Sequence, residues 1–204
     1  MDSIFEGVFS EYTVNGVAFK PSGANAYTLV DGAGSASEEY ERKVITKAKS
    51  NVVVKKIARS SGSGTLTLSL HMPMELYNTL QGLLSAAAGG VISGVSALPG
   101  RVQIPAVEIA MEVEDEDGDK KYKYYPHATS SAFSRSVSSE SDTVAEVEMT
   151  FDLSVDAYDN IMYEALASGL PTTGDLTKDN WMTSVSSELL QGEGATGATG
   201  ETEG

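Results

Sequence analysis

Two stretches of this sequence alternate between apolar and polar residues, with Ala110 as the one apolar residue at a polar position. The first runs from Val107 to Val113 and the second from Ala145 to Val155. Successive side chains of a β-strand point to opposite faces, so this period of two predicts strands with one buried face and one wet face. The chain must therefore bury one side of a sheet. The acidic residues on the predicted wet faces are Glu108, Glu112, Glu146, Glu148 and Asp152.

A turn and an aromatic segment follow the first of these strands. The acidic run from Asp115 to Asp119 contains Asp117-Gly118, a dipeptide typical of tight turns between paired strands. The tyrosine-rich segment 122–125 comes next, which predicts an antiparallel hairpin. A further strand is predicted at 65–70, where leucines alternate with threonine and serine.

Two segments change to helical spacing. Apolar residues recur every three or four positions from Leu76 to Ala87, which predicts one amphipathic helix at about 73–88. Asp156 is a suitable cap for a short second helix at about 157–168. The predicted fold class is therefore mainly β: an antiparallel β-sandwich or barrel with one flanking α-helix, a short second helix and a long protruding hairpin.

The charges of the chain are distributed unevenly. Residues 1–71 carry 8 basic and 7 acidic side chains, whereas residues 72–204 carry 6 and 22, so the net charge changes from +1 to −16. The segment 42–59 is basic, contains no acid and has the pattern of a long hairpin. Such a hairpin contacts acidic surfaces of other copies, or it is a solvated hairpin that happens to be basic. Its basic and apolar residues are Arg42, Lys43, Val44, Ile45, Lys47, Lys49, Val52, Val53, Val54, Lys55, Lys56, Ile57 and Arg59.

The composition excludes several kinds of chemistry. Without cysteine and with two histidines, the chain has no disulfide framework, no thiolate metal site and no cysteine nucleophile. The acidic turn fails as a calcium loop because Val113 and Tyr124 occupy the positions of its first and last ligands. Gly32-Ala33-Gly34 lacks the third glycine of a dinucleotide loop. We therefore expect no catalytic residue, no metal and no cofactor.

The two ends of the chain lack the signals of export and of a packed core. The first residues contain no positive region followed by an apolar run, and no stretch reaches the ~18 apolar residues of a membrane span. We expect no membrane contact. Residues 191–204 are mainly glycine, alanine, threonine and glutamate. The sequence therefore predicts one domain at 1–190 and a flexible tail at 191–204.

The order of these segments resembles that of the major tail proteins, or tail tube proteins, of long non-contractile-tailed phages. The likeness covers roughly residues 1–180. It consists of the order of the segments and of the residues within short segments, rather than of a short invariant motif. It includes the leucine-alternating strand that leads through Pro73 into the 73–88 helix, the strand at 108–114, the Asp-Gly hairpin with its tyrosine-rich return, and the strand at 143–155.

This resemblance implies a structural role rather than an enzymatic one. In that family six protomers form a ring, rings stack into a tube, and genome DNA passes through the lumen without specific binding. Expected partners are further copies of the chain and other tail proteins, such as the tape measure and terminator proteins. The expected location is the virion tail, assembled in the host cytoplasm. A long hairpin commonly bridges adjacent rings in that family, and residues 42–59 match it in position and length.

The charge of the chain suggests what would line such a lumen. Negative walls repel phosphate, so DNA slides past them without being retained. We therefore expect the acidic faces of the two alternating strands to line the lumen, with the five acids named above. Alternatively, these acids lie on the outside of the tube and only keep an abundant protein soluble.

Two other classes of function remain open at the level of sequence. A non-enzymatic β-sandwich module that binds carbohydrate or protein fits the same fold, and it requires an exposed aromatic platform. Trp181 and the cluster at 122–125 are the residues that could supply one. An enzyme is the weakest alternative, because no nucleophile, base and orienting group can be assembled from the sequence.

Overall fold

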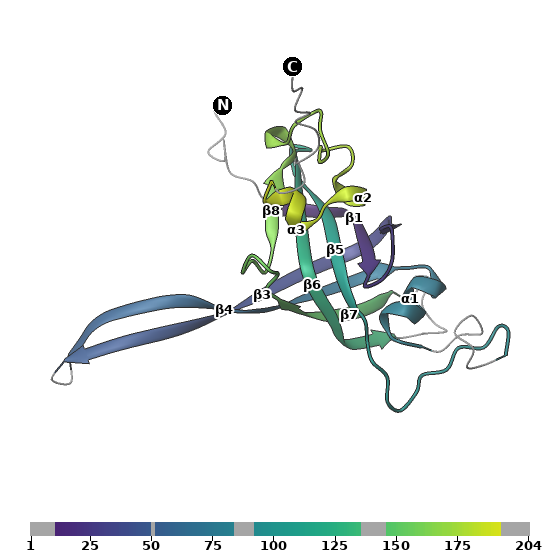
Figure 1. The fold of residues 1–204 in the computed structure, drawn as a ribbon, viewed down its shortest axis with the longest axis horizontal. Coiled ribbons are helices and arrows are strands. Elements are labelled where there is room, and N and C mark those ends of the chain that lie inside the picture. The colour runs from purple at the N-terminus through teal and green to yellow at the C-terminus, as the bar shows by residue number, and fades with distance from the viewer. Residues whose placement is uncertain (1–10, 50–51, 84–91, 136–145, 193–204) are drawn as a thin grey trace, which may run out of the picture.

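The computed structural model describes residues 11–49, 52–83, 92–135 and 146–192 (Figure 1). This part of the chain is mainly β, as predicted, and its few helices are short. The strands are β1 (Glu11–Pro21), β2 (Thr28–Val30), β3 (Gly32–Lys49), β4 (Val52–His71), β5 (Ala106–Asp115), β6 (Lys120–Arg135), β7 (Val147–Ser154) and β8 (Tyr163–Leu166). The helical segments are α1 (Met74–Leu80), η2 (Ala167–Gly169), α2 (Trp181–Ser184) and α3 (Ser187–Leu190).

All eight strands belong to one antiparallel sheet. Its order is β2-β1-β5-β6-β7-β4-β3, and β8 pairs with β6. The C-terminal half of β6 pairs with β7, whereas its first residues pair with β8. The sheet curls so that β1 and β3, which are far apart in its order, approach each other. One face of the curled sheet therefore encloses a core.

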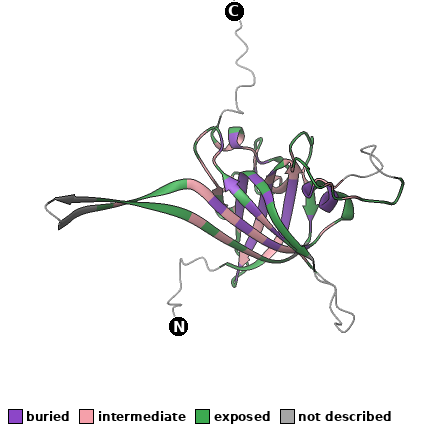
Figure 2. Cartoon of the chain, turned by 90° about the horizontal axis from the view of Figure 1, so that it is seen from below, coloured by how far each residue is buried: buried purple, intermediate pink, exposed green. Residues whose placement is uncertain are grey.

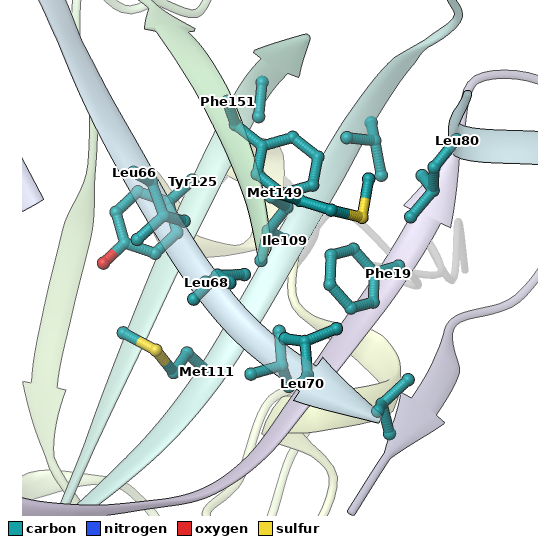
Figure 3. Close-up of a cluster of buried hydrophobic side chains, with 14 of the residues drawn as sticks. Phe19, Leu66, Leu68, Leu70, Leu80, Ile109, Met111, Tyr125, Met149 and Phe151 are labelled. Carbon is teal, nitrogen blue, oxygen red and sulfur yellow. The ribbon is translucent and has the colours of Figure 1, made fainter. Parts of the chain in front are cut away.

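The main hydrophobic core lies on the inner face of this curl (Figure 3). The leucines of β4 meet Ile109 and Met111 of β5 there, together with Met149 of β7. Phe19 of β1 packs on Phe151 of β7 with ring centroids 6.0 Å apart. Each predicted alternating strand turns its apolar residues inward, which confirms the assignment made from the period of two.

A second apolar cluster lies on the opposite face of β1, β5 and β6. There the C-terminal segment covers the sheet, and Trp181 of α2 stacks on Tyr122 with ring centroids 5.6 Å apart. Ala18 and Ala110 lie beneath in the same cluster, and their small side chains leave room for the indole. The sequence predicted a wet face for β5, and this is wrong around Ala110, because a segment far along the chain packs there.

The predicted hairpin at 42–59 is the outer part of a longer one (Figure 1). Strands β3 and β4 pair from Gly32 opposite His71 to Lys49 opposite Val52. The arm, which we define as residues 42–60, extends away from the body and is largely exposed where its side chains are described (Figure 2). The strand predicted at 65–70 is thus continuous with the second strand of the hairpin. Side chains of residues 47–55 lie outside the described part of the structure.

A bulge marks the base of the arm. Tyr40 pairs with Gly64 and Arg42 with Ser60, so β4 has extra residues between these pairs. Gly62 lies there with a φ of +80°, a conformation that favours glycine. Beyond this point burial no longer alternates along β4, because the arm has left the core.

The first predicted helix is present but shorter than expected. It ends at Leu80, and Gly82 follows with a φ of +62°. The amide of Leu83 donates to the carbonyl of Asn78, and that of Gly82 donates to Thr79, which is the pattern of a Schellman cap. A helix to residue 88 was predicted because the apolar spacing continues past this glycine. Residues 84–88 lie outside the described part.

The second predicted helix, at 157–168, is wrong. This segment forms a turn, then β8 and the 3₁₀ helix η2. Asp156 caps the turn instead of a helix: its Oδ1 accepts the amides of Tyr158 and Asn160. Strand β8 then pairs with the part of β6 that β7 does not reach, and the backbone hydrogen bonds of the sheet outweigh the local helical spacing.

The Schellman cap gives a test of this account of α1. Replacing Gly82 with alanine forces a left-handed φ on a residue with a Cβ, which would lie 2.5 Å from Cγ2 of Val102. We expect Gly82→Ala to lower the free energy of unfolding by about 1–2 kcal/mol in urea denaturation. Gly100→Ala is the control, because nothing lies within 4 Å of its added Cβ. Equal stability of the two variants would contradict the assignment.

Candidate functional site

The outer side of β3, β4, β7 and the end of β6 is an uncovered sheet surface of the described chain. Residues paired across antiparallel strands point to the same side, so the register defines rows on this surface. One row contains Ser37, Thr67, Thr150 and Ala132. We call this surface the polar face and define it as Ser35, Ser37, Glu39, Thr65, Thr67, Ser69, Thr129, Ala132, Ser134, Glu148, Thr150 and Asp152.

The polar face presents hydroxyl and carboxylate groups. Its twelve positions include no lysine, no arginine and no large apolar residue. The hydroxyls of Thr67 and Thr150 lie 3.3 Å apart, and the nearby Ser131 hydroxyl donates to Asp152 over 2.9 Å. The register of the strands fixes the orientation of this face. A shift of β4 by one residue would bury the polar groups of its outer side and expose its leucines.

The structure divides the five predicted acids into two groups. Glu148 and Asp152 are exposed on the polar face, and Glu146 lies just before β7 with its Oε1 3.8 Å from Nε2 of His71. Glu108 and Glu112 are on β5, where they are only partly exposed and already have partners. Whether any of the five lines a channel stays a prediction.

Glu108 accepts hydrogen bonds from several groups that join distant segments. Lys20 donates to it over 3.0 Å, and the hydroxyls of Tyr27 and Tyr124 both lie 2.9 Å from its Oε2. Burial raises the pKa of both tyrosines, and the charge of Glu108 raises it further, so both phenols stay protonated donors. The Tyr27 hydroxyl also lies 2.8 Å from the carbonyl oxygen of Val185. This carboxylate therefore helps to hold the C-terminal segment on the sheet.

Glu112 forms an ion pair with Lys120 at the start of β6. The two charged groups lie 2.7 Å apart, and Asn15 of β1 also donates to Glu112 over 3.2 Å. The hydrogen bond to Glu112 is the main cause of a raised pKa for Lys120. Three strands thus meet at this carboxylate, and its contacts are those of a structural residue.

A buried ionic cluster closes the curl of the sheet, and the sequence did not predict it. Lys123 of β6 has a side chain only 5% exposed, and its Nζ lies 2.7 Å from carboxylate oxygens of both Glu11 and Glu38. Tyr40 and Tyr125 donate to Glu38 over 2.8 and 2.7 Å. The one available signal was a lysine inside the run of tyrosines at 122–125.

The arm displays both basic and apolar side chains. Arg42, Lys43, Lys56 and Arg59 are exposed, as are Val44 and Ile45, with 59% and 39% of their surface accessible. Ile45 pairs with Ile57, and the next pair along the same face is Lys43 with Arg59. Like charges directly opposite each other destabilise a hairpin, so the isolated arm gains from anionic neighbours. The predicted residues whose side chains lie outside the described part are Lys47, Lys49, Val52, Val53, Val54 and Lys55.

The aromatic platform that a binding module requires is not exposed. Trp181 is fully buried, and Tyr122 is buried against it. In the described ranges no group of three or more histidines, aspartates or glutamates is arranged to hold a metal ion. No helix among the same residues is long and apolar enough to span a membrane.

Comparisons with known proteins give remote likenesses in structure. No protein-family model and no curated protein matches the sequence. A chain of the PVC sheath-tube complex, an extracellular contractile injection system in its extended state, matches with 12% identity and a TM-score of 0.47, over 81% of this chain and 98% of that one. A chain of the anti-feeding prophage tube-terminating cap matches with 11% identity and a TM-score of 0.45, over 81% and 99%.

A third structure, Hcp1 from Flavobacterium johnsoniae, matches with 10% identity and a TM-score of 0.35, over 66% of this chain and 87% of that one. Because these TM-scores are all below 0.5, the likeness does not by itself place the chain in a family.

The ionic cluster at Lys123 predicts a large effect of one substitution. Lys123→Met leaves the largely buried carboxylate of Glu38 without its cation, whereas Glu11, which is 42% exposed, keeps Lys121 as a partner. We expect this substitution to lower the free energy of unfolding by about 3 kcal/mol. Lys120→Met is the matched control on the same strand. It removes a lysine whose side chain is 43% exposed, and we expect a cost below about 1 kcal/mol. Urea denaturation of both variants at neutral pH measures the difference.

The same cluster predicts a dependence on pH. Burial raises the pKa of Glu11, but hydrogen bonds and charges from Lys123 and Lys121 outweigh it, so the net pKa is lowered. The resulting stabilisation is complete above the ordinary value of 4.5 and is lost as the pH falls through the lowered folded-state pKa. Lys123→Met should therefore lose less stability on acidification than the wild type. An equally steep loss would show that other carboxylates dominate.

Proposed function

We propose that this chain is a structural subunit that assembles with copies of itself into rings and then into a tube, as tail tube proteins of phages do. The polar face is the observation that carries this proposal. A channel wall needs a broad sheet surface that a packed core supports from behind. Its exposed groups must not bind the molecule that passes over it. The polar face meets this need because a packed core lies behind it and its exposed groups are hydroxyls and carboxylates.

The ends of the sheet support assembly into rings. β3 pairs on one side with β4 and ends the order of the sheet, and it is 18 residues long. A long strand that is paired on one side only is a site for association, and natural proteins usually cover it. A closed ring covers such an edge on every protomer with the same contact. We infer a ring of six from the resemblance in sequence.

The arm supports the stacking of rings. Burial of its exposed valine and isoleucine against a neighbour would remove apolar surface from water, and its arginines and lysines would gain from anionic partners. A neighbouring ring would offer an apolar surface and carboxylates to the arm of each copy. The aliphatic parts of lysine and arginine side chains can pack on apolar residues while their charged ends reach the carboxylates. The arm thus acts between rings, whereas the sheet acts within one.

The charge of the polar face favours the passage of a polyanion. Glu39, Glu148 and Asp152 repel phosphate, and no amine lies among its positions to retain it. We therefore infer that the tube conducts genome DNA during ejection, within the tail of a virion. The partners that this role requires are other tail proteins, such as a tape measure and a terminator.

Assembly is the first test of this proposal. The purified protein should form rings and tubes at high concentration, visible by negative-stain microscopy and by sedimentation. A deletion of 44–57 bridged by glycine and serine keeps the core residues of β4, so it should stay folded but form no long tubes. If the full chain sediments only as a 21.5 kDa species, even after seeding with assembled tails, the proposal is wrong.

Reversing charge on the polar face tests the conduit. Glu148→Lys with Asp152→Lys places amines where phosphate would pass, so tubes of this variant should retain at least about ten-fold more DNA than wild-type tubes at ~0.1 M salt. Particles built with the variant should eject DNA poorly. Glu188→Lys, an exposed reversal in α3, is the control. Equal retention by all three tubes would remove the polar face from the channel.

A further inference from the structure

Most of the exposed large apolar side chains of the described residues belong to two parts of the structure, and the others are Tyr12, Leu29 and Leu166. More than half of all these side chains lie on α1, on the loop after residue 92, and at Phe133 near the end of β6. Val44 and Ile45 of the arm form the second group. The arm and α1 lie at opposite ends of the longest axis of the molecule (Figure 1). The members at the α1 end are Met74, Ile92, Val95, Leu98, Val102 and Phe133.

The α1 end is a formed surface, because its loop is tied to the helix. The Asn78 side chain of α1 donates to the Ser96 hydroxyl over 2.9 Å. Phe133 packs edge-on against Tyr77 with ring centroids 5.9 Å apart. Large apolar side chains gathered in this way are typical of a site that binds another protein.

A groove beside α1, lined by none of these six exposed side chains, provides a place for an aliphatic side chain. It has a volume of about 420 Å³ and lies between α1 and the turn that joins β1 to β2. Its lining includes Pro21, Ala24, Pro73 and Leu76, and its one charged residue is Glu75. In the described part of the chain no amine forms an ion pair with this carboxylate. The groove thus combines apolar walls with one unpaired negative charge.

The arm has the complementary chemistry. Ile45 and Val44 are aliphatic and exposed, and the charged residues beside them, such as Lys43 and Arg59, are all basic. We propose that the arm of one copy docks in the groove beside α1 of the next, with Ile45 among the apolar walls and Lys43 or Arg59, on the same face of the arm, near Glu75. This inference rests on the proposed function and names the acceptor surface for the contact between rings.

Head-to-tail geometry follows from the two ends. Each copy offers an arm at one end of its long axis and an acceptor at the other, so copies stacked in the same orientation make a heterologous contact that does not close. It therefore extends an assembly along one direction, as stacking requires. The acidic turn at 115–119 is the rival acceptor, since it offers charge to a basic arm but fewer apolar walls.

Cross-linking between copies can test this acceptor, because the chain has no cysteine of its own. A Val44→Cys copy is mixed with a Met74→Cys copy under assembly conditions and treated with a short thiol cross-linker. Docking brings the two thiols to a high effective concentration, so we expect at least about ten-fold more cross-linked dimer than with a Glu116→Cys partner. Met74 is 62% exposed, so this substitution should not disturb the core.

A charge exchange gives an independent readout. Glu75→Lys alone and Lys43→Glu alone should each raise the protein concentration needed for tubes, and the double variant should restore it. Tubes that form without the 44–74 cross-link, or with a stronger link to position 116, would overturn this acceptor while the proposed function stands. If no rings or tubes form at all, both proposals fail.

Discussion

The curl of the sheet depends on an amino group that is buried among carboxylates. Lys123 lies on an inward position of β6, and a lone ammonium there would be too costly to bury. Glu11 from β1 and Glu38 from β3 both reach it, and two tyrosine hydroxyls share Glu38. These residues come from strands far apart in the order of the sheet, so satisfying one charge draws its distant strands together. Hydrogen bonds to the two carboxylates outweigh the effect of burial and raise the pKa of Lys123, so the cation persists over the whole neutral range.

Closure of the curl decides which surfaces are left for other molecules. The inner face is filled by the main core, and the C-terminal segment covers the outer face over β1, β5 and β6. Among the described residues, the polar face, the arm and the α1 end are three surfaces that stay exposed. These three surfaces differ in chemistry: the first is hydroxylic and acidic, the second is basic and aliphatic, and the third is apolar. In the groove beside the third, Glu75 has no ion pair with any described residue. In the proposed function, the first of these surfaces lines the channel, and the other two contact each other between rings.

Strands with a regular alternation were predictable, and segments whose structure depends on distant partners were not. The leucines at 66, 68 and 70 can be buried together only on one face of a strand, so their pattern was decisive. The helical spacing at 157–168 was equally regular, but the free edge of β6 recruited Tyr163–Leu166 as a strand. The candidate acids show the same limit. Glu148 and Asp152 lie on an open face, while Glu108 has an identical local pattern and is engaged by Lys20, Tyr27 and Tyr124.

The sequence by itself determined the class of the fold, the inward residues of the main strands and the presence of a basic hairpin. These features follow from the geometry of a strand and from the separation of charge along the chain, both of which are local. Tertiary structure alone decided that Trp181 covers β5, that Lys123 is neutralised by Glu11 and Glu38, and that the arm and the α1 groove lie at opposite ends. The physical reason is that each of these features depends on contacts between groups that are far apart in the sequence. A local pattern of residues contains no information about which distant group a side chain will contact.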